Sequence, residues 1–222
     1  MAVHLIEKEL TGLKEKILKM GTLVEEQIGA AIKTYATRDV SLGRQTIQND
    51  HLVNAMDVEI DEECIRLLAL YQPAARDLRF ITTAMKIATD LERMSDLSED
   101  ICERAIELSE EEPMQSHSQD IIKMAEASQK MVIEALDAFV RGDVVLARKV
   151  CTDDAFVDEL THRVFKGLVS EMVHDPKVIA RAIRISFISK YIERIADHAT
   201  NIAEVVVYLV EGKIIRHTVV TQ

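Results

Sequence analysis

Two pairs of carboxylates, each spaced four residues apart, are the side chains of this sequence whose types and spacing best suit chemistry. Glu92 and Asp96 form the first pair, and Glu193 and Asp197 form the second. On an α-helix, residues four apart lie on one face, with their Cβ atoms about 5–6 Å apart. Because like charges at this spacing destabilise a helix slightly, a pattern that occurs twice favours a function for the paired carboxylates.

More oxygen donors are expected near both pairs. Asp100 and Asn201 follow one turn later on the same helices. The helices that precede the pairs add Asp50, Asn54, Asp57 and Asp61 in the first half of the chain, and Asp154 and Asp158 in the second. If each preceding helix packs against its carboxylate pair, four or more oxygen ligands converge. Clusters of this kind suit hard cations such as Mg²⁺, Mn²⁺, Ca²⁺ or iron.

The alternative to a metal site is a solvated acidic face. In that case Glu92 and Glu193 would form ion pairs with nearby basic residues, and Arg93 and Arg194 are available for this. A single Glu-x-x-x-Asp is common in helices and is ordinarily explained in this way. Its duplication at matched positions, beside small residues such as Ser95, weakens that explanation, and both alternatives stay open.

Other catalytic or metal sites fit the sequence less well. A di-iron site in a helical bundle needs two Glu-x-x-His motifs, and Glu171-x-x-His174 is a single match without a counterpart in the first half. His198 follows Asp197, and we expect it on a helix surface rather than among metal ligands. No phosphate-binding Gly-rich loop and no Ser/His/Asp or Cys/His arrangement stands out. The sequence therefore does not point to an enzyme.

The composition predicts an all-α protein. The chain has 222 residues, 48% hydrophobic and 29% charged, with only 7 Gly, 3 Pro and 4% aromatic residues. Sheet-rich proteins use more aromatic residues and more turn residues. The formal net charge is −11, from 27 basic and 38 acidic residues. Tight binding of nucleic acid needs clustered Lys and Arg, so we expect no nucleic-acid partner.

The cysteines and the hydropathy indicate a cytoplasmic protein. Cys64, Cys102 and Cys151 are widely spaced and odd in number, which is typical of free thiols in a reducing compartment. The first ten residues carry three charges, unlike a signal peptide. No apolar run approaches the roughly 18 residues of a membrane span. We therefore expect contact with a membrane only through protein partners.

The apolar periodicity predicts six long helices. An apolar stripe at intervals of three and four residues runs from Leu10 to Tyr35, as expected for one helix. Asp39 and Asp143 are predicted helix N-caps, and Pro73 ends a helix at the residue before it. The five later helices are expected over approximately residues 39–70, 74–108, 118–140, 143–174 and 176–211.

The second half of the chain repeats the first. Asp39-Val40-x-Leu42 matches Asp143-Val144-x-Leu146, and Pro73 matches Pro176 at nearly the same offset. The doubled carboxylate pairs fall into the same register. Internal repetition of this kind predicts repeated supersecondary units. We predict two tandem, pseudo-symmetric three-helix bundles, with domains over residues 1–112 and 113–222 and the polar stretch before Pro113 as the linker.

These features together resemble the PhoU family, and the resemblance runs from about Leu10 to Val210. The doubled Glu-Arg-x-x-Asp inside a doubled bundle is far more specific than either copy alone. The motifs that carry the resemblance are Gln72-Pro73 followed by Asp77-Leu78-Arg79, Leu91-Glu92-Arg93 with Asp96, Ile192-Glu193-Arg194-Ile195-Ala196-Asp197, and Asn201-Ile202.

The resemblance implies an accessory protein of a phosphate-specific transport system. The family connects a phosphate ABC transporter to a sensor histidine kinase and holds the phosphate-starvation response off when phosphate is plentiful. For this chain it implies a non-enzymatic negative regulator in the cytoplasm, expected as a homodimer. The implied partners are the ATPase subunit of the transporter and the cytosolic part of the kinase, with its PAS domain the expected contact.

The resemblance also implies multinuclear metal clusters on the two carboxylate faces. The sequence does not choose among iron, zinc, manganese and magnesium. This chain departs from the family pattern at Ser95 and Ala196, where Gly is common, and at Ala180, where the first copy has Asp77. The implied ligands are Asp50, Asp57, Glu92 and Asp96 in the first bundle, and Asp154, Asp158, Glu193 and Asp197 in the second.

Two other functions stay open on the residues alone. A metal-dependent hydrolase or another metalloenzyme on a helical bundle would also use clustered carboxylates, although these faces contain few His residues. A purely structural scaffold would bind no metal and would pair Glu92 and Glu193 with neighbouring Arg side chains. Turnover that scales with added metal would favour the first function. A melting temperature that divalent cations leave unchanged would favour the second.

Overall fold

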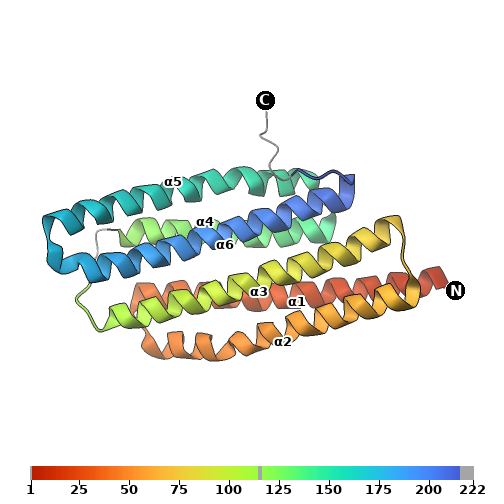
Figure 1. The fold of residues 1–222 in the computed structure, drawn as a ribbon, viewed down its shortest axis with the longest axis horizontal. Coiled ribbons are helices and arrows are strands. Elements are labelled where there is room, and N and C mark those ends of the chain that lie inside the picture. Colours follow the sequence, from red (N-terminus) through yellow and green to blue (C-terminus); the bar gives the residue numbers. More distant parts are fainter. Residues whose placement is uncertain (1, 115–116, 216–222) are drawn as a thin grey trace.

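The computed structural model describes residues 2–114 and 117–215, and within these ranges it contains six α-helices and one short 3₁₀ turn (Figure 1). The elements are α1 (Ala2–Thr37), α2 (Val40–Tyr71), α3 (Ala75–Ser109), α4 (Ser118–Arg141), α5 (Val144–His174), η1 (Pro176–Val178) and α6 (Ile179–Glu211). The prediction of an all-α fold with six long helices is therefore confirmed.

The helices form two elongated bundles that lie lengthwise against each other. Helices α1, α2 and α3 make one bundle and α4, α5 and α6 make the other, as Figure 1 shows. The bundles meet where α3 packs against α6 and α1 packs against α4. Within each bundle the carboxylate-bearing helices are neighbours, since α2 packs on α3 and α5 packs on α6. The predicted domain division, after residue 112, lies in the connection between α3 and α4.

The apolar stripe of the first helix faces the core, as the periodicity predicts. Leu13, Ile17, Met20 and Val24 are all buried in α1, and the stripe continues to Ala31. Burying each large side chain of this kind contributes about 1.5–3 kcal/mol relative to leaving it exposed. Most of the stability of such a long helix comes from this packed face rather than from its intrinsic propensity.

The predicted helix boundaries are confirmed where a local signal sets them. The Asp39 carboxylate accepts a hydrogen bond from the Leu42 N–H at 3.0 Å, and Asp143 accepts one from the Leu146 N–H at 2.9 Å. Each satisfies one of the backbone donors that a helix N-terminus leaves without a partner. At Gln72, just before Pro73, α2 ends with a left-handed residue.

The start of the last helix differs from the prediction. Residues Pro176–Val178 form the 3₁₀ turn η1, and α6 begins only at Ile179. The Asp175 carboxylate accepts a hydrogen bond from the Lys177 N–H at 3.0 Å, and Pro176 occupies the first position, where its missing N–H costs nothing. The tight turn reverses the chain between α5 and α6 without a longer loop.

Close contacts hold the two bundles in one fixed arrangement. A Cβ atom built at Gly21 of α1 would lie 2.5 Å from a Leu136 methyl group of α4, so a larger residue there would force the Leu136 side chain to shift. At one end of the molecule, Phe80 of α3 stacks on Phe139 of α4, with ring centroids 5.6 Å apart. Well-packed side chains of this kind leave little room for sliding, so the two carboxylate faces have a defined relative position.

Two of the three cysteines are buried in the packing of the helices. Cys64 and Cys102 are buried, Cys151 is half-buried, and none of the three forms a disulfide. Burial raises the pKa of Cys64 to about 12 and that of Cys102 to about 11, so both thiols are unreactive at neutral pH. Among the described residues, no helix combines the length and apolar character that crossing a bilayer requires.

Candidate metal centres

The first carboxylate face is assembled from α2 and α3. Asp50 is buried, and Asp57, Glu92 and Asp96 are half-buried. The pKa of Glu92 is raised first by burial and then by the charge of Asp96, with Asp57 and Asp50 on the facing helix adding to the effect. Such interactions require short distances. The four residues that the sequence predicts for the first bundle therefore lie near enough to one another to interact electrostatically.

A buried hydrogen-bond network holds Asp50 in place at the inner edge of this face. The Ser95 hydroxyl lies 2.6 Å from Asp50 Oδ1 and 2.5 Å from Gln27 Oε1, and Asn54 Nδ2 donates to Asp50 Oδ2 at 2.7 Å. A hydroxyl has one proton to donate, so Ser95 serves one of its two acceptors at a time. Sequence reasoning missed Gln27, because it lies on α1 and far away in the chain.

Arg93 covers the solvent side of the first face. Its Nη1 lies 2.9 Å from Asp96 Oδ2, and its Nε lies 3.4 Å from Glu92 Oε2. The Arg93 side chain is itself 56% exposed, and exposed ion pairs typically contribute only about 0–1 kcal/mol. The arginine can therefore swing away at little cost, and the ion pairs are compatible with either alternative for this face.

The second face is built from α5 and α6. The pKa of Asp154 is raised to about 6, first by burial and then by the charges of Asp158, Asp197 and Glu193. The pKa of Asp197 is raised too, first by burial and then by Glu193. The four residues that the sequence predicts for the second bundle therefore also lie together.

Two carboxylate oxygens of the second face lack a hydrogen-bond partner. Asp154 Oδ1 and Glu193 Oε2 are buried, and neither makes a hydrogen bond within residues 2–114 and 117–215. The other Glu193 oxygen, Oε1, lies 2.7 Å from Lys190 Nζ. The basic residue that pairs with Glu193 is thus Lys190, and not Arg194 as the sequence suggested. An unsatisfied buried oxygen costs about 1–3 kcal/mol, which a bound cation or water would offset.

The donors of both faces fit a hard cation, although their present side-chain positions do not enclose one. All predicted ligands offer carboxylate oxygens, the type that magnesium, calcium and manganese prefer. In the described part of the chain, no three His, Cys, Asp or Glu side chains converge closely enough to hold a metal ion. Binding would require side-chain rotations, which half-buried carboxylates at a helix surface allow. Metal binding at these faces stays a prediction.

The two carboxylate faces differ in the residues around them, although the Glu-x-x-x-Asp motif is the same in both. Asp57 and Asp61 contribute to the first face, where Asp61 raises the pKa of Asp57 after burial. At the matching positions the second copy has Thr161 and Phe165. Glu99 also borders the first face, and its pKa is raised by burial and then by Asp50. Sequence reasoning overlooked Glu99 because the second copy has no carboxylate at that position.

His198 lies between the bundles rather than on an open helix surface. Its Nδ1 is 2.8 Å from Asp90 Oδ1 of α3, and its side chain is only 18% exposed. Asn201 Nδ2 donates to the same Asp90 oxygen at 3.3 Å. The expectation of a surface histidine is therefore wrong. His198 helps to join α6 to α3.

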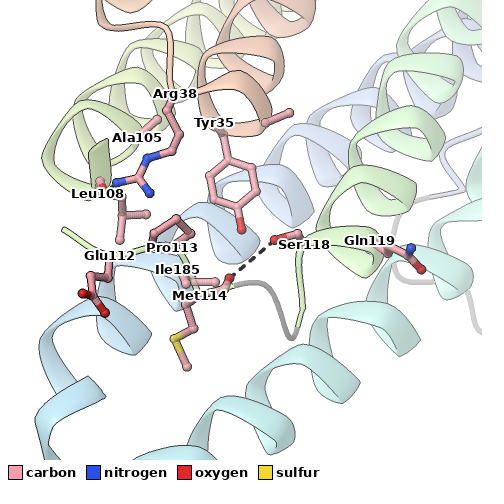
Figure 2. Close-up of a pocket in the computed structure, with 11 residues that line it drawn as sticks. Tyr35, Arg38, Ala105, Leu108, Glu112, Pro113, Met114, Ser118, Gln119 and Ile185 are labelled. Atoms are coloured by element: carbon pink, nitrogen blue, oxygen red, sulfur yellow. Dashed lines mark hydrogen bonds between the residues drawn. The ribbon is translucent and has the colours of Figure 1, made fainter. Parts of the chain in front are cut away.

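A cavity of about 420 Å³ lies where the bundles meet, at the ends of α1 and α3 and the starts of α4 and α6. In Figure 2 the Tyr35 ring points into it toward Ser118. Arg38 also borders it, but its guanidinium donates to the carbonyls of Leu108 and Ser109 at 2.7 and 2.8 Å. Where Arg38 borders the cavity, one of its guanidinium nitrogens is therefore bonded to the carbonyls at the end of α3.

The chain matches the family model described as PhoU domain twice, over residues 17–105 and 121–206. It is 43% identical to the phosphate-specific transport system accessory protein PhoU homolog of Aquifex aeolicus, over 95% of both chains. It is 41% identical to the protein of the same name from Pseudomonas aeruginosa, over 96% of this chain and 88% of that one.

Solved structures agree with this relationship. The crystal structure of PhoU from Pseudomonas aeruginosa superposes with a TM-score of 0.91 at 41% identity, covering 93% of this chain and 99% of that one. The crystal structure of the phosphate transport system regulatory protein PhoU from Streptococcus pneumoniae superposes with a TM-score of 0.88 at 29% identity, covering 94% and 98%. With its family domain matched in both halves, this chain belongs to the PhoU family.

Proposed function

We propose that this protein is an accessory, regulatory component of a phosphate-specific transport system. The observation that carries the proposal is the match of both bundles to the PhoU domain, together with near-complete relatives named as accessory proteins of that system. In this role the protein acts in the cytoplasm without catalysis of its own. It holds the phosphate-starvation response off when phosphate is plentiful.

The regulator works as an adaptor between two partners. One partner is the ATPase subunit of the phosphate ABC transporter, and the other is the cytosolic part of a sensor histidine kinase, through its PAS domain. Long rigid helices with defined faces support this role, because preformed surfaces lose little entropy on binding. The adaptor acts as a homodimer, which light scattering on the purified protein tests directly.

The adaptor proposal is tested by binding and by signalling together. The purified chain is expected to bind the immobilised ATPase subunit and the kinase domain from its own source. Deletion of its gene is expected to activate the starvation response in phosphate-rich medium. If the chain binds neither protein and its deletion leaves the response off, the adaptor function is wrong.

Metal ions are proposed to stabilise the carboxylate faces. Asp50, Asp57, Glu92 and Asp96 would hold one cluster, and Asp154, Asp158, Glu193 and Asp197 the other. The partnerless buried oxygens of Asp154 and Glu193 support this assignment, as does the all-carboxylate donor set. A bound ion would supply the positive charge that offsets repulsion between these groups. It would also fix how α2 crosses α3 and how α5 crosses α6.

Elemental analysis of the purified protein tests the metal proposal. Iron, zinc, manganese or magnesium is expected in the wild-type protein and is expected to be lost in the Glu92→Ala/Glu193→Ala variant. Glu62→Ala/Glu159→Ala is the matched control, because both residues are exposed glutamates on the same helix pairs. Equal metal content in all three proteins would place the ions elsewhere.

Two further measurements address the alternative functions. Metal that binds the folded state must raise the melting temperature, so an unchanged melting temperature with each cation would favour a metal-free scaffold. Hydrolysis of a generic phosphate ester in proportion to added metal would favour an enzyme. We expect a raised melting temperature and no such hydrolysis.

A further inference from the structure

The α5/α6 hairpin presents two apolar stripes to solvent. Each stripe repeats every four residues, so its members lie along one side of their helix. All six side chains are between 39% and 79% exposed. The stripe on α5 consists of Phe165, Val169 and Val173, and the stripe on α6 consists of Ile179, Ile183 and Phe187. We call these six residues the α5/α6 apolar face.

The two stripes meet at a hollow between the helices. Phe165 and Phe187 both line this hollow, whose volume is about 550 Å³, and the charged residues Lys190, Asp158 and Glu193 line it too. The Phe187 ring is held by stacking on Tyr191, with the ring centroids 6.1 Å apart. A hollow between two aromatic rings suits a large apolar side chain, the usual anchor of a protein–protein contact.

The face is large enough to receive a helix. Aromatic side chains bury on the order of 200 Å² each and the four Val and Ile side chains less, so six that are about half exposed offer on the order of 500 Å². That is close to the largest apolar patch of a typical monomer, and such patches are often functional. Helix α4 packs on the inner side of α5 and α6. A helix laid between the two stripes would therefore be a fourth member of this bundle.

The first bundle lacks the aromatic rings of this face, although Ile65 and Leu78, which match Val169 and Ile179, are also exposed. In the register that aligns the two halves, Asp61 stands in place of Phe165 and Lys86 in place of Phe187. The same three-helix core therefore forms without the exposed rings. Since folding does not require these rings at the surface, their presence in the second bundle indicates a contact made by that bundle alone.

The surroundings of the face are basic in an otherwise acidic protein. Residues 162–190 contain six Lys and Arg and two Asp and Glu, a formal charge of +4, whereas the whole chain carries −11. The arginines of this segment are ion-paired with carboxylates of α3, α4 and the segment after α3. Lys166 and Lys177 are exposed, and neither forms an ion pair with any described residue. Asp175 is exposed and forms no ion pair with a described residue either, so the free charge of this segment is +1. The carboxylates Asp158 and Glu193 border the stripes only at the hollow.

We infer that the α5/α6 apolar face binds an amphipathic helix of a partner protein, with acidic residues of that helix beside Lys166 and Lys177. The apolar side of the helix lies between the stripes, and one large side chain enters the hollow between Phe165 and Phe187. This recognition mode places apolar residues of the bound helix at intervals of three and four. The inference rests on the proposed function, because it gives the adaptor one of its docking surfaces.

Two designed peptides test the inference without knowledge of the partner. Both are fluorescein-labelled amphipathic helices of about 18 residues with one Leu/Phe stripe; one carries Glu on its polar side and the other carries Lys. Fluorescence anisotropy with the full chain in EDTA is expected to show at least about tenfold tighter binding of the acidic peptide. EDTA removes any attraction by metal on the neighbouring carboxylate face.

Three variants assign the binding to this face. Phe165→Ser/Phe187→Ser is expected to lower the affinity for the acidic peptide at least about tenfold. Lys166→Glu/Lys177→Glu is expected to remove the preference for the acidic peptide. The control is Val145→Ser, which removes an 80% exposed apolar side chain elsewhere on α5 and is expected to change nothing. Because all these side chains are exposed, circular dichroism melts should match the wild type.

Several results would overturn the inference. One is equal binding of both peptides, and another is unchanged binding by the phenylalanine variant. If the wild type is a dimer that this variant converts to monomers, the face joins two copies of the chain instead. If the wild type sediments with phosphatidylglycerol vesicles and the variant does not, the face contacts a membrane. If the phenylalanine variant binds the ATPase subunit and the kinase as well as the wild type does, this face is not a docking surface for either. The proposed function would then still stand.

Discussion

Ser95 connects three helices of the first bundle through a single hydroxyl, which approaches both Asp50 of α2 and Gln27 of α1. Replacing Ser95 by Ala removes the one proton that these two buried acceptors share. We expect the free energy of unfolding to fall by about 1–3 kcal/mol, measured by urea denaturation. Ser98→Ala is the control, because that hydroxyl bonds only within its own helix, to the Met94 carbonyl. An equal loss in both variants would show that the network contributes nothing.

Asp154 is expected to make the metal-free protein less stable as the pH rises. Burial and three neighbouring carboxylates raise its pKa to about 6 in the folded protein, from an ordinary value of 3.8. Between these values the folded protein retains a proton that the unfolded chain has released, so the free energy of unfolding falls as the pH rises through this window. Asp154→Asn is therefore expected to match the wild type near pH 4 and to exceed its stability above pH 6.

Thermal melts in EDTA across that pH range measure this effect. Asp153→Asn provides the control, since Asp153 is the adjacent carboxylate but pairs with Lys149 at 2.6 Å. We expect Asp153→Asn to keep the wild-type dependence on pH. If Asp154→Asn also keeps it, burial and repulsion at Asp154 do not limit the stability of the second face.

For individual residues, the sequence predicts a site only where the members of the site are regularly spaced along one helix. The pairs Glu92/Asp96 and Glu193/Asp197 follow from a four-residue interval, and the structure adds the facing carboxylates as expected. The contact between His198 and Asp90 joins side chains 108 residues apart. No local pattern encodes such a contact, because it depends on which faces of α3 and α6 meet.

Helix ends provide a matched experiment on backbone conformation. Helices α2 and α4 both end in a left-handed residue, Gln72 with φ +45° and Gly142 with φ +62°. In both, the N–H of the capping residue bonds to a carbonyl four residues earlier. Left-handed backbone strains residues that have a Cβ atom but not glycine.

Exchanging the two residues should therefore have opposite effects. We expect Gln72→Gly to raise the free energy of unfolding by about 0.5 kcal/mol, because relief of strain exceeds the added entropy of the unfolded chain. Gly142→Gln is expected to lower it by about 1 kcal/mol. Chemical denaturation of both variants measures the difference. A change of the same sign in both would mean that side-chain contacts, and not backbone strain, determine stability at these caps.

Elements were predictable from the sequence where a short-range signal begins or ends them. Asp39 and Asp143 cap their helices, and Pro73 stops α2, as the sequence predicts. The turn η1 was not predictable, because Pro suits the first position of an α-helix and of a 3₁₀ turn equally. Nor did the sequence show that Gly21 marks the approach of α1 to α4, since that requires knowing which helix lies opposite.

For the whole molecule, the sequence predicts the duplication but not the way in which the copies pack. Helix α3 packs against α6 of the other bundle as extensively as against α2 of its own. The interface also contains ion pairs from Arg184 to Glu107 and Glu111, at 2.7 and 2.9 Å. A helical periodicity shows that a face is buried and does not identify its partner. The division into two domains therefore stays a prediction from the sequence repeat. The extensive interface leads us to a separate prediction, about how the protein unfolds.

The two bundles are expected to unfold together. Separating them would expose the apolar surfaces of α3 and α6 to water, so neither bundle keeps its stability once the other is lost. Scanning calorimetry of the metal-free chain is expected to show one transition, with calorimetric and van't Hoff enthalpies in a ratio of about 1. Arg184→Ala should lower the temperature of that single transition without dividing it. Two separate transitions, or fragments 1–112 and 113–222 that each melt as cooperatively as the full chain, would show that the bundles are independent domains. Binding at one carboxylate face could then not stabilise the other.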